Sequence, residues 1–160
     1  MAMINDTFNE HVAENVIEYV TVMIGDQLFG LPISRVQDVF MPERMTRVPL
    51  APPEVAGILN LRGRVVTAVD MRVRLDLGTR QPGAPVMAIG IEFKGESYGL
   101  LVDAVGEVMH LPNNTCEAKP TNLDARLAKV AAGIYRLEGQ LLIVLDVDRL
   151  LDIKSDAVAA

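Results

Sequence analysis

Cysteine and aromatic residues are scarce in this chain of 160 residues. It contains one cysteine, Cys116, no tryptophan, and only 4% aromatic residues. A single cysteine cannot form an internal disulfide, so we expect the protein to work in a reducing compartment, the cytoplasm. Because aromatic side chains are few, the apolar half of the sequence is mainly aliphatic and rich in valine, which favours β-strands.

Positive charge and long apolar runs are also lacking. The 15 Lys and Arg against 21 Asp and Glu give a net charge of −6 and an isoelectric point near 4.9. Nucleic-acid binding needs a basic surface to neutralise phosphates, so this class is excluded. The longest apolar run, Leu141–Leu145, has the length of a strand and falls far short of the roughly 20 residues of a membrane span. The first residues show no signal-peptide pattern, and we expect no membrane insertion.

Histidine and cysteine do not form a catalytic or metal-binding pattern. The two histidines are His11 and His110, and neither stands at a zinc-type spacing from Cys116. His110 and Cys116 could meet in space as a nucleophile pair, but an exposed imidazole and a packed thiol are the simpler interpretation. We therefore predict no metal site and no catalytic residue, and expect that the protein is not an enzyme.

The glycines and two of the aspartates likewise indicate structural roles rather than cofactor binding or catalysis. The stretch Gly57–Gly63 lacks the glycine spacings that cradle phosphates, so no nucleotide or other cofactor is expected. Asp70 and Asp146 each follow an apolar strand and precede a helix-like segment. We interpret both as N-cap residues, which accept backbone N–H groups at the start of a helix.

Short strands separated by turn residues occur in two similar copies. Phe29-Gly30-Leu31 recurs as Tyr98-Gly99-Leu100, 69 residues later, and Gly57-Ile58 recurs as Gly133-Ile134, 76 residues later. Each copy spans roughly 70 residues, with turns about every 8–12 residues, a spacing typical of small barrels or sandwiches.

The predicted fold is all-β with short helices: two five-stranded SH3-like barrel lobes around a shared hydrophobic core. Two lobes that share apolar surface are more stable than either alone. Whether a terminal segment crosses over to complete the other lobe stays open. The predicted organisation is an N-terminal arm (1–17), a first lobe (18–80), a second lobe (86–153) with a helical segment (122–131), and a C-terminal tail (154–160).

One cationic side chain, Arg62, stands out in a tight turn between two strongly apolar strands. Arg64 would project near it, and so would Arg47 if the preceding loop folds back. Two interpretations remain open from the spacing. Either the turn is simply solvated, or the guanidinium of the arginine donates hydrogen bonds to a carboxylate or carbonyl group of a partner protein.

A second candidate surface is the strand that holds Val36 and Val39. It opens after Pro32 and ends before Pro42, which marks an edge strand. Exposed edges pair readily with another chain. Filling of the barrel interior by these valines is an equally good interpretation.

Five segments resemble the CheW family of bacterial chemotaxis adaptors. The most specific is Gly57-Ile58-Leu59-Asn60-Leu61-Arg62-Gly63, and the resemblance covers Glu18 to Ile153, nearly the whole chain. The other matching segments are Phe29–Val39, Val69–Arg72, Tyr98–Asp103 and Leu145–Leu151.

The resemblance implies an adaptor that joins methyl-accepting chemoreceptors to the histidine kinase CheA and scaffolds signalling arrays. Its implied partners are the regulatory domain of CheA, the cytoplasmic tips of the receptors, and further copies of the adaptor. It would be cytoplasmic and recruited to membrane-associated arrays. The implied fold is a pair of five-stranded SH3-like barrels that flank a hydrophobic groove.

The resemblance also assigns residues to protein binding. Val36, Asp38 and Arg62 fall where the family contacts receptors or supports signalling, and this chain has Asp38 where glutamate is common. The remaining residues of the implied binding set are positions where substitution would disturb receptor or kinase binding (Gly57, Val105 and Val108) and the other residues of the turn motif (Asn60, Leu61 and Gly63).

Two alternatives from the sequence remain. One is a CheW-like adaptor in a non-flagellar pathway, such as pilus, surface or developmental signalling, whose residues would look much the same. The other is a small-ligand-binding β-barrel, which predicts a closed apolar cavity.

Overall fold

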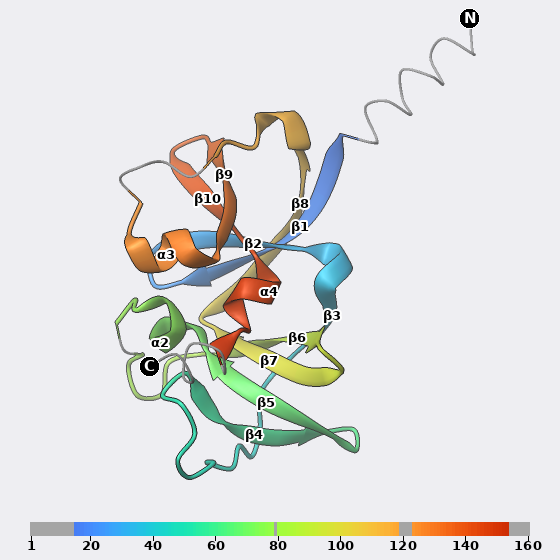
Figure 1. Cartoon of the computed structure of the whole chain (residues 1–160), viewed down its shortest axis with the longest axis vertical. Coiled ribbons are helices and arrows are strands. Elements are labelled where there is room, and N and C mark those ends of the chain that lie inside the picture. The colour runs from blue at the N-terminus through green and yellow to red at the C-terminus, as the bar shows by residue number, and fades with distance from the viewer. Residues whose placement is uncertain (1–14, 79, 119–122, 154–160) are drawn as a thin grey trace, which may run out of the picture.

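Two five-stranded sheets make up the structure, a computed structural model that describes residues 15–78, 80–118 and 123–153 (Figure 1). The strand order is β8-β1-β2-β10-β9 in sheet A and β3-β6-β7-β5-β4 in sheet B. The mainly β architecture with two five-stranded units, predicted from the turn spacing, is confirmed. The strands are β1 (Val16–Ile24), β2 (Gln27–Pro32), β3 (Val36–Phe40), β4 (Val55–Leu61), β5 (Arg64–Asp70), β6 (Met87–Phe93), β7 (Glu96–Val102), β8 (Ala104–Pro112), β9 (Ala131–Leu137) and β10 (Gln140–Leu145).

The two sheets do not follow the two halves of the sequence. Sheet A combines the hairpin β1–β2 of the first half with β8, β9 and β10 of the second, and sheet B combines the hairpin β6–β7 with β3, β4 and β5. In both sheets the hairpin joins its three partners in the same way, because β2 runs parallel to β10 and β7 runs parallel to β5. Each half therefore completes the other through its first hairpin.

Both sheets curl until the chain beyond one edge strand meets the opposite edge strand. Thr46, beyond β3, exchanges two backbone hydrogen bonds of 2.8 Å with Ile58 of β4. Glu117, beyond β8, does the same with Ile134 of β9, at 2.7 and 2.9 Å. Equivalent bridges at equivalent places give both lobes a barrel-like form.

The largest apolar cluster joins the two lobes. It holds fully buried side chains from both sheets, such as Leu31 of β2 and Leu100 of β7, together with Leu150 of helix α4 (Val147–Leu150). Figure 1 shows α4 between the two sheets, where Arg74 donates to the carbonyl oxygens of Leu150 (2.8 Å) and Arg149 (3.1 Å). The two lobes thus share one hydrophobic core.

Short helices connect several of the strands. The short elements are η1 (Ile33–Arg35), α2 (Met71–Leu75), η2 (Asn113–Thr115), α3 (Ala125–Val130) and α4 (Val147–Leu150). Of these, α2, α3 and α4 lie where the sequence indicated helical segments, whereas η1 and η2 were not predicted.

The predicted N-caps of α2 and α4 are confirmed. The Asp70 carboxylate accepts the N–H groups of Arg72 and Val73, and that of Asp146 accepts the N–H of Arg149. None of the helices in the described ranges is long and apolar enough to cross a membrane.

The predicted terminal segments fall almost entirely outside the described residues. β1 already begins at Val16, inside the segment predicted as an arm, and residues 1–14 lie outside the described part. The predicted tail, 154–160, lies outside it as well.

Candidate functional site

The turn between β4 and β5 presents Arg62 at its tip. Arg62 and Gly63 both have positive φ, 53° and 84°, as a two-residue type I′ hairpin turn requires. The Asn60 side chain accepts a 2.9 Å hydrogen bond from the backbone N–H of Gly63, which stabilises the conformation of the turn. Asn60 and Gly63 therefore shape the turn, and the exposed Arg62 is the side chain that it offers to a partner.

Replacing Gly63 with alanine is expected to lower the free energy of unfolding by about 1 kcal/mol, because the new side chain would occupy the left-handed region. The surroundings are open, since a Cβ at this position would have no neighbour within 4 Å among the residues that the structure describes. The cost therefore arises from the backbone alone, and urea unfolding would measure it. A stability equal to that of the wild type would contradict the turn assignment.

The three arginines considered from the sequence do not gather at one place. Thr46 pairs antiparallel with Ile58, so Arg47 lies toward the end of β4 that is remote from Arg62. Arg47 there shares a surface hollow with Asp70. The proximity of Arg47 to Arg62, which depended on how the loop folds back, is not found, because the loop runs antiparallel to β4 and carries Arg47 away from the turn.

β3 is an edge strand of sheet B, as the flanking prolines indicated. Val39 is 42% exposed, whereas Val36 is half-buried against the interlobe core. Asp38 lies opposite Gly90 of β6, and its Oδ2 is 3.9 Å from Nη2 of Arg64. One valine thus fills the core and the other remains available to a partner.

Sequence reasoning missed the contact between Asp38 and Arg64. It joins β3 to β5, which are not neighbours in the sheet, and it forms because sheet B curls. A strand pattern carries no signal for such a contact.

Val105 and Val108 lie on β8, which is an edge strand of the other sheet. Val105 packs against the interlobe core, and Val108 is 41% exposed. Apart from Gly57, the predicted binding residues are therefore distributed over three places: the β3 edge, the β8 edge and the β4–β5 turn.

Gly57 is buried, and a partner cannot contact it directly. A Cβ built on it would lie 2.5 Å from the carbonyl oxygen of Thr46. Gly57 is needed because the bridge between Thr46 and Ile58 brings two main chains together at this point. Leu61, at the end of the same strand, is half-buried against the smaller core cluster of sheet B.

Cys116 and His110 have different surroundings. Cys116 packs with the apolar cluster of Tyr19 and Tyr135, whose hydroxyl groups are 3.1 Å apart. The exposed His110 faces Glu18, at 3.8 Å between Nε2 and Oε2. Across the residues that the structure describes, no three His, Cys, Asp or Glu residues gather as a metal site would require.

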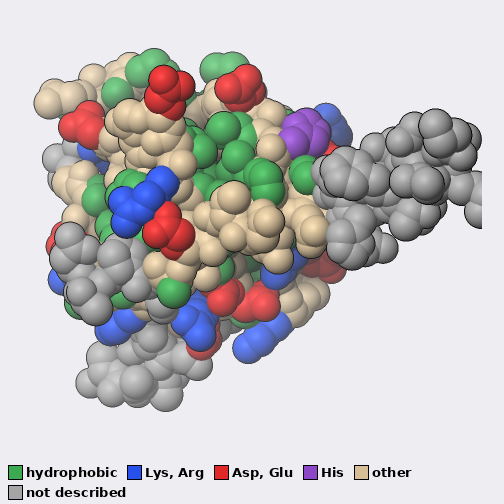
Figure 2. Space-filling view, turned by 90° about the horizontal axis from the view of Figure 1, so that it is seen from above, with side chains coloured by type: hydrophobic (Ala, Val, Ile, Leu, Met, Phe, Trp, Pro, Cys, Tyr) green, Lys and Arg blue, Asp and Glu red, His purple; other side chains and the backbone are tan. Residues whose placement is uncertain are grey.

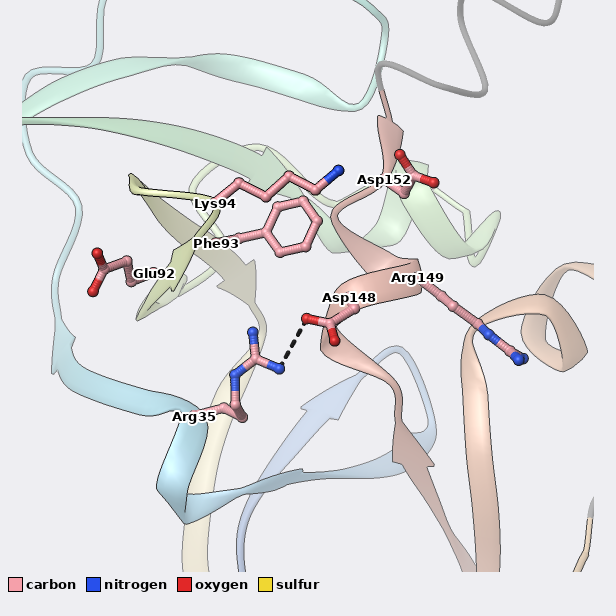
Figure 3. A pocket seen from close by; sticks show the side chains of 7 residues that line it. All are labelled: Arg35, Glu92, Phe93, Lys94, Asp148, Arg149 and Asp152. Carbon is pink, nitrogen blue, oxygen red and sulfur yellow. Dashed lines mark ion pairs between the residues drawn. The ribbon is translucent and has the colours of Figure 1, made fainter.

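A hollow lies between η1, the β6–β7 turn and α4 (Figure 3). The side chains of Arg35 and Asp148 approach each other across it, with a 2.9 Å ion pair. Cations and carboxylates balance along its wall, so the hollow has no net charge that would select a charged ligand. It is lined by Arg35, Glu92, Phe93, Lys94, Asp148, Arg149 and Asp152.

Comparison with known proteins identifies similar sequences and a similar structure. The CheW-like domain model matches residues 18–155. The chemotaxis protein CheW of Rhizobium meliloti is 28% identical over 139 residues, which are 87% of this chain and 90% of that protein. Protein PilI of Pseudomonas aeruginosa is 26% identical over 75% of this chain and 67% of its own length.

The crystal structure of the scaffolding protein TtCheW from Thermoanaerobacter tengcongensis matches with a TM-score of 0.76 and 29% identity. The match covers 85% of this chain and 92% of TtCheW.

Proposed function

The chain belongs to the CheW-like domain family of chemotaxis adaptors, and from this membership we propose that it couples methyl-accepting chemoreceptors to the histidine kinase CheA. In this proposal the protein has no catalytic activity. It binds the regulatory domain of CheA and the receptor tips, and it is a cytoplasmic protein that is recruited to membrane-associated arrays, where further copies of the adaptor join it.

The observation that carries the proposal is the separation of the candidate binding residues. An adaptor has to hold two partners at once, which requires surfaces that do not overlap. The exposed valines Val39 and Val108 lie on the edge strands of different sheets, and Arg62 lies at the tip of a hairpin. Edge strands accept further chains readily, and an exposed arginine is a favoured anchor at protein interfaces.

The mechanism is scaffolding. The adaptor holds receptor and kinase together, and the signalling state of the receptor then biases kinase activity. Such coupling requires that the affinity between the partners differs between the receptor's signalling states.

Replacing Arg62 with alanine is expected to impair receptor-stimulated kinase activity while the fold stays intact. The guanidinium is exposed and at the tip of the turn, so its loss removes a partner contact and no core packing. We expect a decrease of about tenfold or more, the usual effect of truncating an interface anchor. Kinase activity in arrays reconstituted from receptor, CheA and adaptor would measure it.

A matched control is available in the other hairpin. Lys94 also has positive φ, 51°, and is followed by Gly95 with φ 77°, so Lys94→Ala removes a cation from a turn of the same form. This control should stimulate the kinase like the wild type. Normal stimulation by Arg62→Ala would contradict the role of Arg62. If the wild-type protein bound neither the CheA regulatory domain nor a receptor cytoplasmic fragment in a titration, the proposed function itself would be wrong.

A second candidate is the same adaptor role in a non-flagellar pathway. The observation in its favour is that one relative, Protein PilI, has a name other than CheW. A swimming-plate assay of a deletion strain distinguishes the two, because only loss of a chemotaxis adaptor abolishes migration toward attractants.

A further inference from the structure

The loop 41–54, which connects β3 to β4, carries a group of exposed apolar side chains. Met41, Met45, Val48 and Leu50 are all exposed, and Leu50 is 105% exposed, so that no described residue packs on its side chain. Soluble proteins rarely gather exposed apolar side chains in this way, and such groups mark interaction sites. The loop is therefore a candidate binding surface that neither the turn at Arg62 nor the edge strands include.

Leu50 is held in a backbone conformation that leucine rarely adopts. Its φ is 64°, and the N–H of Ala51 donates a 3.4 Å hydrogen bond to the carbonyl oxygen of Val48. The preceding Pro49 is restricted to negative φ, so the turn is of type II, and its third position normally holds Gly or Asn. A leucine there strains the backbone and gains no packing within the chain. Strain of this kind concentrates at functional sites, which indicates a role for Leu50 in binding.

A hollow of about 590 Å³ lies beside Leu50, between the loop and α2. Its wall is mainly apolar, with Val48 and Pro52 from the loop, Ala56 from β4, and Val73 from α2. Val73 is 38% exposed, so the α2 side of the hollow is open to a further apolar side chain. The same face of the molecule thus carries a projecting apolar side chain and an apolar recess.

Two charged residues, Arg47 and Asp70, line the same hollow. Arg47 is exposed, and no ion pair is found for it among the described residues. One carboxylate oxygen of Asp70 accepts the N–H groups of Arg72 and Val73, and the other is 3.9 Å from the guanidinium of Arg80, beyond hydrogen-bond distance. A face with one cation and one carboxylate is self-complementary across a two-fold axis, because each cation can face the carboxylate of the other copy.

From these features we infer that this face binds a second copy of the chain. The Leu50 side chain of each copy enters the hollow of the other, and Arg47 of each copy faces the Asp70 carboxylate of the other. A second copy fits because one surface supplies both halves of the contact, the projecting side chain with its recess and the cation with its carboxylate. Such a contact closes on itself and ends at a dimer.

The two-fold contact leaves the candidate partner surfaces free. The loop lies at the sheet B end of the molecule (Figure 1), and Arg47 lies toward the end of β4 that is remote from Arg62. Figure 2 shows the opposite end, that of sheet A, where apolar side chains gather at the middle of the face. The inference deepens the proposed function, which includes further copies of the adaptor but gives them no surface. Its test needs only the purified chain.

The test measures self-association of the full chain by sedimentation equilibrium, from micromolar to millimolar concentration. The wild type should form dimers and no larger species. Leu50→Asn should weaken the dimer about a hundredfold, tenfold or more from each of the two buried leucines. Val65→Thr is the matched control, because it replaces an exposed valine of β5 outside the hollow, and it should dimerise like the wild type.

Urea unfolding at low concentration, where the chain is monomeric, separates binding from structure. Leu50→Gly and Leu50→Asn should unfold at the same or a higher urea concentration than the wild type, because both residues tolerate positive φ. A residue needed only for the fold would lose stability instead, and that result would contradict a binding role.

Two charge variants test the second part of the contact. Arg47→Gln and Asp70→Asn should each weaken the dimer about fivefold at low salt and less at high salt, because salt screens exposed charge pairs. Asparagine is an equally good N-cap, so Asp70→Asn keeps the start of α2. Unchanged dimerisation of both variants would contradict the charge pairing.

A wild-type chain that stays monomeric over the whole range, or a Leu50→Asn variant that dimerises like the wild type, would overturn the inference. Growth into larger assemblies would overturn its two-fold form. Loss of affinity of Leu50→Asn for the CheA regulatory domain or a receptor fragment, with a monomeric wild type, would assign the face to that partner instead. A wild type that dimerises but binds neither partner would support the inference and refute the proposed function.

Discussion

Replacing Arg72 with alanine is expected to lower the free energy of unfolding by about 2–3 kcal/mol. Arg72 of α2 donates to both carboxylate oxygens of Asp103, at 3.0 and 2.6 Å, and the two side chains are only 20% and 21% exposed. Asp103 also accepts the N–H of Gly25 in the β1–β2 turn, at 2.8 Å. Asp103 therefore connects α2 to the β1–β2 turn. In the variant its half-buried carboxylate would lose its main hydrogen-bond partner.

The size of this loss is limited by a neighbouring cation. Nε of Arg80 lies 3.6 Å from the same carboxylate and can compensate in part. Urea unfolding at pH 7 would measure the effect. Arg126→Ala is the matched control, because the Arg126–Asp76 pair is 62% and 65% exposed and an exposed pair contributes less than about 1 kcal/mol. Equal losses for the two variants would contradict the structural role of Arg72.

The same pair predicts an acid dependence. The hydrogen bonds from Arg72 are the largest influence on the pKa of Asp103, which lies below its usual value in the folded protein. A carboxyl whose pKa is lowered by folding stabilises the protein above its unfolded pKa, about 3.9, and this contribution is lost as the pH falls through the folded value. The stability difference between wild type and Arg72→Ala should therefore be complete at pH 7 and narrow below about pH 4. A difference that stayed constant down to pH 3 would contradict this assignment.

Local features could be predicted from the sequence because their causes are local. The β4–β5 hairpin follows from Arg62-Gly63 between two apolar runs, and the caps at Asp70 and Asp146 follow from an aspartate between a strand and a helix. The repeat predicted two similar lobes, and the prolines around β3 predicted an edge strand. Apart from the repeat, whose copies lie 69 and 76 residues apart, each of these signals is local in the sequence.

Contacts between distant segments could not be predicted, because they depend on how the sheets are assembled. Two copies of one repeat can pair within or between copies with the same strand pattern. The exchange of the hairpins β1–β2 and β6–β7 is therefore visible only in the structure. The pair of Asp38 with Arg64 and the distance of Arg47 from Arg62 both follow from the curl of sheet B, which no local pattern encodes.

Substituting Gly57 with valine is expected to lower the free energy of unfolding by about 2 kcal/mol or more and to weaken partner binding. The new Cβ would lie 2.5 Å from the carbonyl oxygen of Thr46, which is main chain and is held by two hydrogen bonds to Ile58. The segment around Thr46 would have to move away from β4. Because Gly57 is buried, any loss of receptor or kinase binding arises from this displacement and not from a lost contact. Urea unfolding and partner titrations of the same variant would measure both effects.

Gly133 provides a comparison that separates main-chain from side-chain obstruction. It is the counterpart of Gly57 in the other lobe, but a Cβ there would meet Sγ of Cys116 at 2.5 Å, and the main-chain oxygen of Glu117 only at 3.2 Å. Gly133→Ala should therefore be destabilising, and Cys116→Ala should relieve much of the loss in the double variant. Met45→Ala should not relieve Gly57→Ala, although the Met45 side chain lies 3.1 Å from the new Cβ, because the nearer obstacle is backbone. Recovery of the stability of Gly57→Ala by Met45→Ala would show that the main chain at Thr46 can move away from β4 at little cost. The loss of binding in Gly57 variants would then need a different cause.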